Sequence, residues 1–136
     1  MGLTICNKYG SIDIGYGGFF NLRKNIAGIY SKEFADLYEN WCRGKIKNDE
    51  GNKKLQEFFD NGILKDDDEL VLDFLFASDC KGKLDGKTCR KLYHHIKDYD
   101  DDILYGYVGR PDCAKFKDFK DLVESSYRYR SILRWS

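Results

Sequence analysis

The residues best suited to chemistry lie in the segment SDCKGKLDGKTC (78–89) and in the two histidines that follow it. Cys80 and Cys89 carry thiols, and His94 and His95 carry imidazoles, which are groups that bind transition metals or take part in thiol catalysis. Lysines within the segment would lower the pKa of a nearby thiol. The segment therefore has three interpretations: a metal site, a reactive thiol, or a turn that leads into a helix.

A metal site is poorly matched by the spacing. Structural zinc sites pair cysteines roughly two to four residues apart, but Cys80 and Cys89 are further apart than that. His94 and His95 are adjacent, so on a helix their side chains diverge by about 100°. An EF-hand needs an oxygen ligand where Lys81 stands, and a lysine repels the cation. We therefore expect no metal.

Packing is the favoured role for the two thiols. No C-x-x-C motif is present. Cys89 shares a helical face with Leu92 and Ile96, and a buried free cysteine behaves as a small hydrophobic residue. Cys80 is expected to tuck beneath the turn before this helix. The alternative is a small metal- or thiol-dependent enzyme centred on Cys80, Cys89, His94 and His95.

Three other segments carry candidate binding residues. The glycine-rich stretch 15–20 precedes basic residues but lacks a phosphate-loop motif. The acidic run 98–102 and the C-terminal arginines, which alternate with tyrosines, are charged segments typical of solvated surface. From these segments the candidate binding residues are Tyr16, Arg23, Asp100, Asp101, Asp102, Arg128 and Arg130. We identify no catalytic residue and expect no cofactor.

The composition favours a single folded domain over residues 1–136. The chain is 42% hydrophobic and 15% aromatic, which is enough for a real core. Its 23 basic and 23 acidic side chains cancel, so nucleic acid is not expected as a partner. Nucleic-acid binding through the C-terminal arginines is a weaker alternative. No signal peptide or membrane span is visible, which predicts a soluble, cytoplasmic protein with five free cysteines.

The hydrophobic pattern predicts the elements that position these residues. Short strands are expected at 3–6 and 11–16, followed by a glycine turn and a helix from Phe19. The elements expected after it are a helix capped by Ser31, a loop at 43–52, a short helix to Gly62, a helix or buried strand at 70–77, a helix at 85–99 capped by Asp85, a last helix from Pro111 and a strand at 127–135. Pairing of the last strand with the first gives an α+β fold: a mainly helical single domain with a small antiparallel sheet.

The segments YGGFFNLRKNIA and SDCKGKLDGKTC, with the acidic stretch IKDYDDD and a closing strand, resemble a family of small bacterial and phage-encoded proteins. This resemblance covers most of the chain. It implies a single α+β domain of bacterial, phage or mobile-element origin. The family has no established activity, so the resemblance implies no catalytic residue. Lys81 departs from the acid expected in relatives.

Together these observations predict a non-enzymatic protein-interaction module rather than an enzyme. Exposed tyrosines suit a binding surface because they provide contact area at low entropic cost. The expected partner is a host or bacterial protein. The sequence does not predict the oligomeric state.

Overall fold

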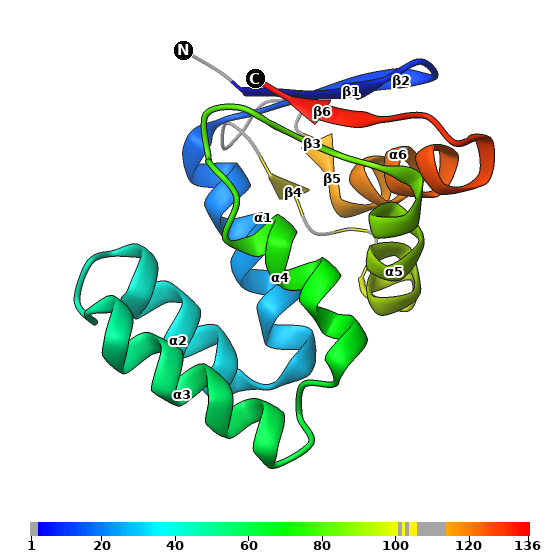
Figure 1. The fold of residues 1–136 in the computed structure, drawn as a ribbon. Coiled ribbons are helices and arrows are strands. Elements are labelled where there is room, and N and C mark those ends of the chain that lie inside the picture. Colours follow the sequence, from blue (N-terminus) through cyan, green and yellow to red (C-terminus); the bar gives the residue numbers. More distant parts are fainter. Residues whose placement is uncertain (1–2, 101, 103, 106–113) are drawn as a thin grey trace.

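The computed structural model describes residues 3–100, 102, 104–105 and 114–136, whose elements are drawn in Figure 1. The strands are β1 (Leu3–Asn7), β2 (Gly10–Ile14), β3 (Gly82–Leu84), β4 (Leu104–Tyr105), β5 (Ala114–Lys115) and β6 (Leu133–Trp135). The α-helices are α1 (Tyr16–Tyr30), α2 (Lys32–Cys42), α3 (Asn48–Asp60), α4 (Glu69–Leu75), α5 (Gly86–Ile96) and α6 (Phe116–Tyr129), and a 3₁₀ turn spans Asp66–Asp68. The predicted α+β class is confirmed.

The main sheet joins the two ends of the described chain. Its strand order is β2-β1-β6-β3, with every neighbouring pair antiparallel. The predicted pairing of the N-terminal strands with a C-terminal strand is therefore confirmed. Strand β3 lies inside the cysteine segment 78–89 and was not predicted, because three residues are too few to show a two-residue period.

Only one face of this sheet is buried. Leu3 and Ile5 of β1 and Leu133 and Trp135 of β6 are buried, as the two-residue period of a strand requires. The helices lie on this side of the sheet, and no described helix or strand covers the other, open side (Figure 1). Arg134, between the two buried residues of β6, is exposed on the open face.

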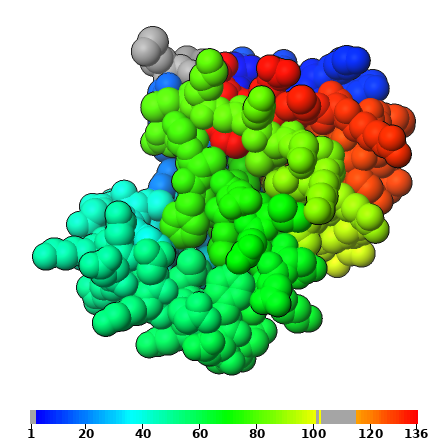
Figure 2. Space-filling view, in the orientation of Figure 1, coloured from blue at the N-terminus to red at the C-terminus, as the bar shows by residue number. Residues whose placement is uncertain are grey.

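The helices extend the fold away from the sheet. Helix α1 runs from the sheet towards α2 and α3, which lie side by side (Figure 1). In the space-filling view, α2 and α3 form the cyan-to-green end of the molecule, and α6 lies in orange at the opposite end (Figure 2). Helices α5 and α6 pack against each other. None of the helices in the described ranges has the length and apolarity needed to cross a bilayer.

Side-chain caps fix where two of the helices begin. The Ser31 hydroxyl accepts a hydrogen bond from the Phe34 amide at 3.0 Å, and the Asp85 carboxylate accepts one from the Thr88 amide at 2.8 Å. Each cap satisfies an amide that the helix itself cannot pair. Both caps were predicted. The segment 70–77, for which helix and strand were both open, is helical in α4.

Aromatic rings connect the sheet to the helices. Phe19 of α1, Phe74 of α4 and Trp135 of β6 contact one another, with ring centroids 5.5–5.9 Å apart. Such tilted and edge-to-face pairs stabilise a core beyond their buried area. The three rings lie at 0–1% exposure, so residues far apart in the sequence meet at one point in the interior.

The predicted strand at 127–135 is correct only over its last three residues, which form β6. Helix α6 continues to Tyr129, and the chain reverses at Arg130, which adopts a left-handed φ of 53°. Residues 128–130 are all exposed, so the alternation of tyrosine and arginine corresponds to no alternation in burial. The true strand, β6, begins later, at Leu133.

Other boundaries also differ from the prediction. Helix α1 begins at Tyr16, so Gly17 lies in its first turn rather than in a turn before it. Helix α3 begins at Asn48, inside the predicted loop 43–52, where Asp49 and Glu50 favour a helix N-terminus. Helix α5 ends at Ile96, before the predicted Tyr99. Helix α6 begins at Phe116, and the predicted start at Pro111 lies outside the described residues.

Candidate functional site

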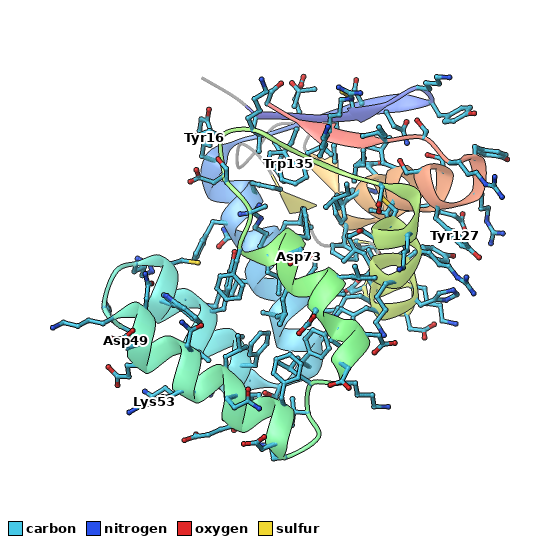
Figure 3. All side chains as sticks on the ribbon, in the orientation of Figure 1. Tyr16, Asp49, Lys53, Asp73, Tyr127 and Trp135 are labelled. Atoms are coloured by element: carbon cyan, nitrogen blue, oxygen red, sulfur yellow. The ribbon has the colours of Figure 1, made fainter. Side chains whose placement is uncertain are left out.

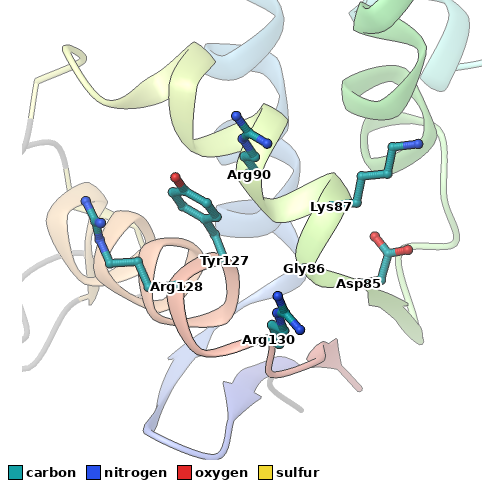
Figure 4. A pocket seen from close by; sticks show the side chains of 7 residues that line it. All are labelled: Asp85, Gly86, Lys87, Arg90, Tyr127, Arg128 and Arg130. Atoms are coloured by element: carbon teal, nitrogen blue, oxygen red, sulfur yellow. The ribbon is translucent and has the colours of Figure 1, made fainter.

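The C-terminal arginines line an open groove between the start of α5 and the end of α6 (Figure 4). The groove has a volume of about 670 Å³ and is lined by Asp85, Gly86, Lys87, Arg90, Tyr127, Arg128 and Arg130. Four of these seven side chains are basic, and one is acidic. The packing of α5 on α6 brings the two basic clusters together, although they are far apart in the sequence.

Two smaller grooves continue this surface. One shares Arg130 with the first groove and also contains Lys8 and Arg134. The other contains Lys83 and shares Ile132 with the second groove. We call the cations of these three grooves the basic surface: Lys8, Lys83, Lys87, Arg90, Arg128, Arg130 and Arg134.

Two of these cations face each other directly across the sheet. Lys83 of β3 and Arg134 of β6 are register partners, and both are exposed on the open face. Like charges at directly opposed positions destabilise a strand pair. The opposed pair of Lys83 and Arg134 therefore lowers the stability of the free protein. Such a pair is expected on a surface that binds a negatively charged ligand.

Most cations of the basic surface form no ion pair within the part of the chain that the structure describes. Arg128 binds Glu124 at 3.3 Å. The pKa of Glu124 is lowered, first by a hydrogen bond from the Tyr93 hydroxyl and then by Arg128. Within the described ranges, the other six cations have no carboxylate within 4.0 Å of their side-chain nitrogens. These charges are available to a negatively charged ligand.

Exposed apolar groups border the basic surface. Tyr9 and Tyr129 are 57% and 63% exposed, and their ring centroids lie 5.0 Å apart. Ile132, which lines two of the grooves, is also exposed. Tyrosine and arginine are enriched in the residues that dominate protein–protein binding energies. The combination of free cations with exposed tyrosines is therefore suited to a protein interface.

Tyr16 and Arg23 do not join this surface. In Figure 3, Tyr16 lies at the start of α1, on the opposite side of the molecule from Tyr127. Arg23, which belongs to α1, is only 4% exposed. Both residues line a separate cavity between α1, α2 and the end of α4. The candidate binding residues therefore fall into at least two groups.

The acidic candidates form a third group. Asp100 and Asp102 are exposed, and the Asp102 amide donates a hydrogen bond to the Asp100 carboxylate at 2.9 Å. Asp101 lies outside the described residues. Neither Asp100 nor Asp102 lines one of the grooves of the basic surface.

The four residues of the alternative metal or thiol site have separate surroundings. Cys89 is fully buried in α5, which raises its pKa to about 12. Cys80 is exposed, so the expectation that it tucks beneath the turn is wrong: the Ser78 hydroxyl accepts from its amide and its thiol donates to Asp79. His94 is exposed, and His95 stacks on Tyr30. Within the described ranges, no three His, Cys, Asp or Glu side chains form a group that could hold a metal.

The sequence reasoning did not identify Lys87, Arg90 or Lys83 as binding residues. Their signal was visible as positive charge around the two cysteines, but it was interpreted through its effect on thiol pKa. Only the packing of α5 on α6 and of β3 on β6 places these cations beside Arg128, Arg130 and Arg134.

The chain matches no protein-family model, no curated protein and no solved structure. Its function is therefore argued from its own geometry.

Proposed function

We propose that the protein is a non-enzymatic interaction module whose basic surface binds an acidic segment of a partner protein. The observation that carries this proposal is that six cations with no ion pair among the described residues gather on adjoining grooves, from β3, α5, β6, the end of β1 and the end of α6. Seven cations against two lining acids, Asp73 and Asp85, give these grooves a local excess of positive charge, although the whole chain has a net charge of zero. Complementary charge gives an interface its orientation and its association rate.

A protein partner is favoured over a nucleic acid. Single-stranded nucleic acids bind on aromatic rings whose faces are open for stacking. The rings of Tyr9 and Tyr129 contact each other at an interplanar angle of 44°, so part of each ring face is covered and cannot stack on a base. The zero net charge also gives no long-range attraction to phosphate. An acidic peptide with apolar side chains would use both the cations and the exposed tyrosines.

The setting that we propose is the cytoplasm of a bacterium, with a host or bacterial protein as the partner. The resemblance to bacterial and phage-encoded proteins supports the source. Cys6, Cys42, Cys80 and Cys89 are free thiols, which suits a reducing compartment. We do not propose a thiol- or metal-dependent enzyme, because Cys80, Cys89, His94 and His95 have separate surroundings.

A labelled synthetic peptide that alternates glutamate with leucine and tyrosine tests the proposal. We expect the wild-type protein to bind it, with an affinity that falls as salt rises. The double variant Arg90→Glu, Arg130→Glu should bind at least roughly tenfold more weakly, because it reverses two charges in one groove. Fluorescence anisotropy measures both affinities.

The matched control reverses two charges elsewhere. Lys45 and Lys53 are exposed on the loop before α3 and on α3 itself, and Figure 3 shows Lys53 far from Tyr127. The variant Lys45→Glu, Lys53→Glu should keep the wild-type affinity within about twofold. Equal loss in both double variants, or tighter binding of a single-stranded oligonucleotide than of the peptide, would contradict the proposal.

A further inference from the structure

Arg23 is a buried charge without a carboxylate partner in the described part of the chain. Its guanidinium donates to the carbonyl oxygen of Ala77 at 2.9 Å and to that of Ser78 at 3.3 Å. It also lies over the ring of Phe19, 4.2 Å from the centroid. Nε of Arg23 is buried and has no hydrogen-bond partner. Two carbonyls and the rings of Phe19, Phe74 and Trp135 therefore surround a full positive charge.

This arrangement is costly for stability alone. A buried charge is normally paired with an opposite charge, and a buried donor without an acceptor costs about 1–3 kcal/mol. Burial lowers the pKa of Arg23 from its usual value, and Tyr38, Cys42 and Asp79 offset this shift only in part. A methionine of similar volume would pack in the same place without this cost. The position therefore suggests a ligand that supplies the missing negative charge.

A cavity lies beside the guanidinium. It has a volume of about 350 Å³, which is within the range of small-molecule sites. Apart from Arg23, its walls are largely aromatic, with Phe19 and Phe20 from α1, Tyr38 from α2 and Phe76 after α4. Such pockets combine apolar walls with few polar groups that orient the ligand.

The charge balance of the lining limits the ligand. Arg23 is the one cation among the lining residues, and Asp79 is the one acid. A phosphate dianion would need more positive charge than this. A carboxylate has a single negative charge and two oxygens that match the planar guanidinium fork.

We propose that this cavity binds a small organic carboxylate, with its carboxylate on Arg23 and its apolar body among the rings of Phe19, Phe20 and Phe76. The site is distinct from the basic surface: the two share Ala77 as a lining residue but none of the seven cations. Binding here therefore does not depend on the proposed partner protein.

Calorimetry with indole-3-acetate and its neutral amide tests the proposal on the full chain. The two probes share an aromatic body and differ in charge. We expect the acid to bind at least roughly tenfold more tightly than the amide, which corresponds to about 1.4 kcal/mol. Arg23→Met should remove this preference, so that the acid binds no better than the amide.

A second variant separates a lost site from a damaged fold. Cys42 lines the cavity but is exposed, so Cys42→Trp should obstruct the cavity without disturbing the core. It should weaken binding of the acid at least tenfold while the melting temperature stays near that of the wild type.

Thiol protection provides an independent readout in the wild-type protein. Bound acid should slow alkylation of Cys42, measured by peptide mass spectrometry, and leave Cys6, which lies outside the cavity, unchanged. Equal affinity for acid and amide, no binding of either at millimolar concentration, or unchanged acid binding in Arg23→Met would overturn the proposal. In each case the role of Arg23 would be only structural, through its hydrogen bonds to the carbonyls of Ala77 and Ser78.

Discussion

The two cysteines of the segment 78–89 take opposite roles. Cys89 is fully buried on α5, and burial raises its pKa to about 12. Cys80 is exposed, and its pKa is raised by the hydrogen bond to Asp79 and by that carboxylate's charge. A thiol reacts as its thiolate and only where the reagent reaches it. The reactivities of Cys80 and Cys89 therefore differ more because of exposure than because of pKa.

We therefore predict selective alkylation of the native protein. At pH 8, iodoacetamide should modify Cys80 and leave Cys89 unmodified, because the reagent cannot reach Cys89 while α5 is folded. Adding denaturant should make both react at similar rates. Peptide mass spectrometry measures the two rates separately. Modification of Cys89 in the native protein at the rate of Cys80 would show that Cys89 is not a core residue.

His95 carries a prediction about pH. Because a carbonyl only accepts, Nε2–H of His95 donates to the Ile26 carbonyl at 3.0 Å, and the ring stacks on Tyr30. Burial lowers the pKa of His95 below 6.5 with a contribution from Lys91, although the hydrogen bond to Ile26 and the charge of Asp68 oppose this shift. The unfolded chain then binds a proton more readily than the folded chain. The contribution of His95 to the free energy of unfolding is complete above pH 6.5 and falls as the pH drops towards the lowered pKa.

The comparison with His95→Gln isolates this effect. Glutamine can still donate to the Ile26 carbonyl but does not titrate. Between pH 7.5 and pH 5, the free energy of unfolding of the wild type should fall more than that of His95→Gln. Urea denaturation at each pH measures both values. His94→Gln, at the exposed neighbouring position, is the control. A wild type that gains stability relative to His95→Gln on acidification would refute the burial argument.

The pairing of β3 with β6 depends on the absence of a side chain at Gly82. A Cβ at this position would overlap the indole ring of Trp135. Since Trp135 is fixed by Phe19, Phe74 and a hydrogen bond from its Nε1 to the Ser78 carbonyl, it cannot move aside freely. We predict that Gly82→Ala lowers the free energy of unfolding by about 1–3 kcal/mol.

Gly17 provides the matched substitution. A Cβ there meets nothing within 4 Å, and the residue lies in the first turn of α1. Gly17→Ala should leave stability unchanged or raise it by up to about 1 kcal/mol, because alanine is the better helix former. Equal effects of the two substitutions in urea denaturation would contradict the contact between β3 and Trp135.

The helices and strands that could be predicted are those whose sequence signals lie entirely within their own residues. Helix α2 has an apolar stripe and a serine cap, and both appear in the structure. The end of α6 was misread because alternation over five residues fits a strand until burial is known. Strand β3 is too short to show a period, and its conformation depends on β6, which is distant in the sequence.

In the candidate site, too, only the residues with a local sequence pattern could be predicted. Arg128 and Arg130 were identified from a local cluster of arginine and tyrosine. Lys87 and Arg90 join them only through the packing of α5 on α6. Arg23 was noted for its charge, but its burial requires Phe74 and Trp135, which no local pattern connects to it.

At the scale of the molecule, one core extends from the sheet to α2. It includes Leu3 and Trp135 in the sheet and Phe34 and Tyr38 in α2. The Tyr38 hydroxyl also donates to the Leu75 carbonyl of α4 at 2.9 Å. Because these contacts link the α2–α3 end to the rest, we expect it to unfold together with the sheet and not before it.

The two tryptophans allow this expectation to be tested at both ends. Trp41 lies in α2, and Trp135 lies in β6. In Trp135→Phe the remaining fluorescence reports on α2, and in Trp41→Phe it reports on the sheet. Within each variant, the urea midpoint from fluorescence should coincide with that from far-ultraviolet circular dichroism, even though Trp135→Phe lowers the midpoint itself. A fluorescence transition of Trp41 at lower urea than the dichroism transition would mean that α2 and α3 separate first, and the shared core would then not hold the molecule together as one cooperative unit.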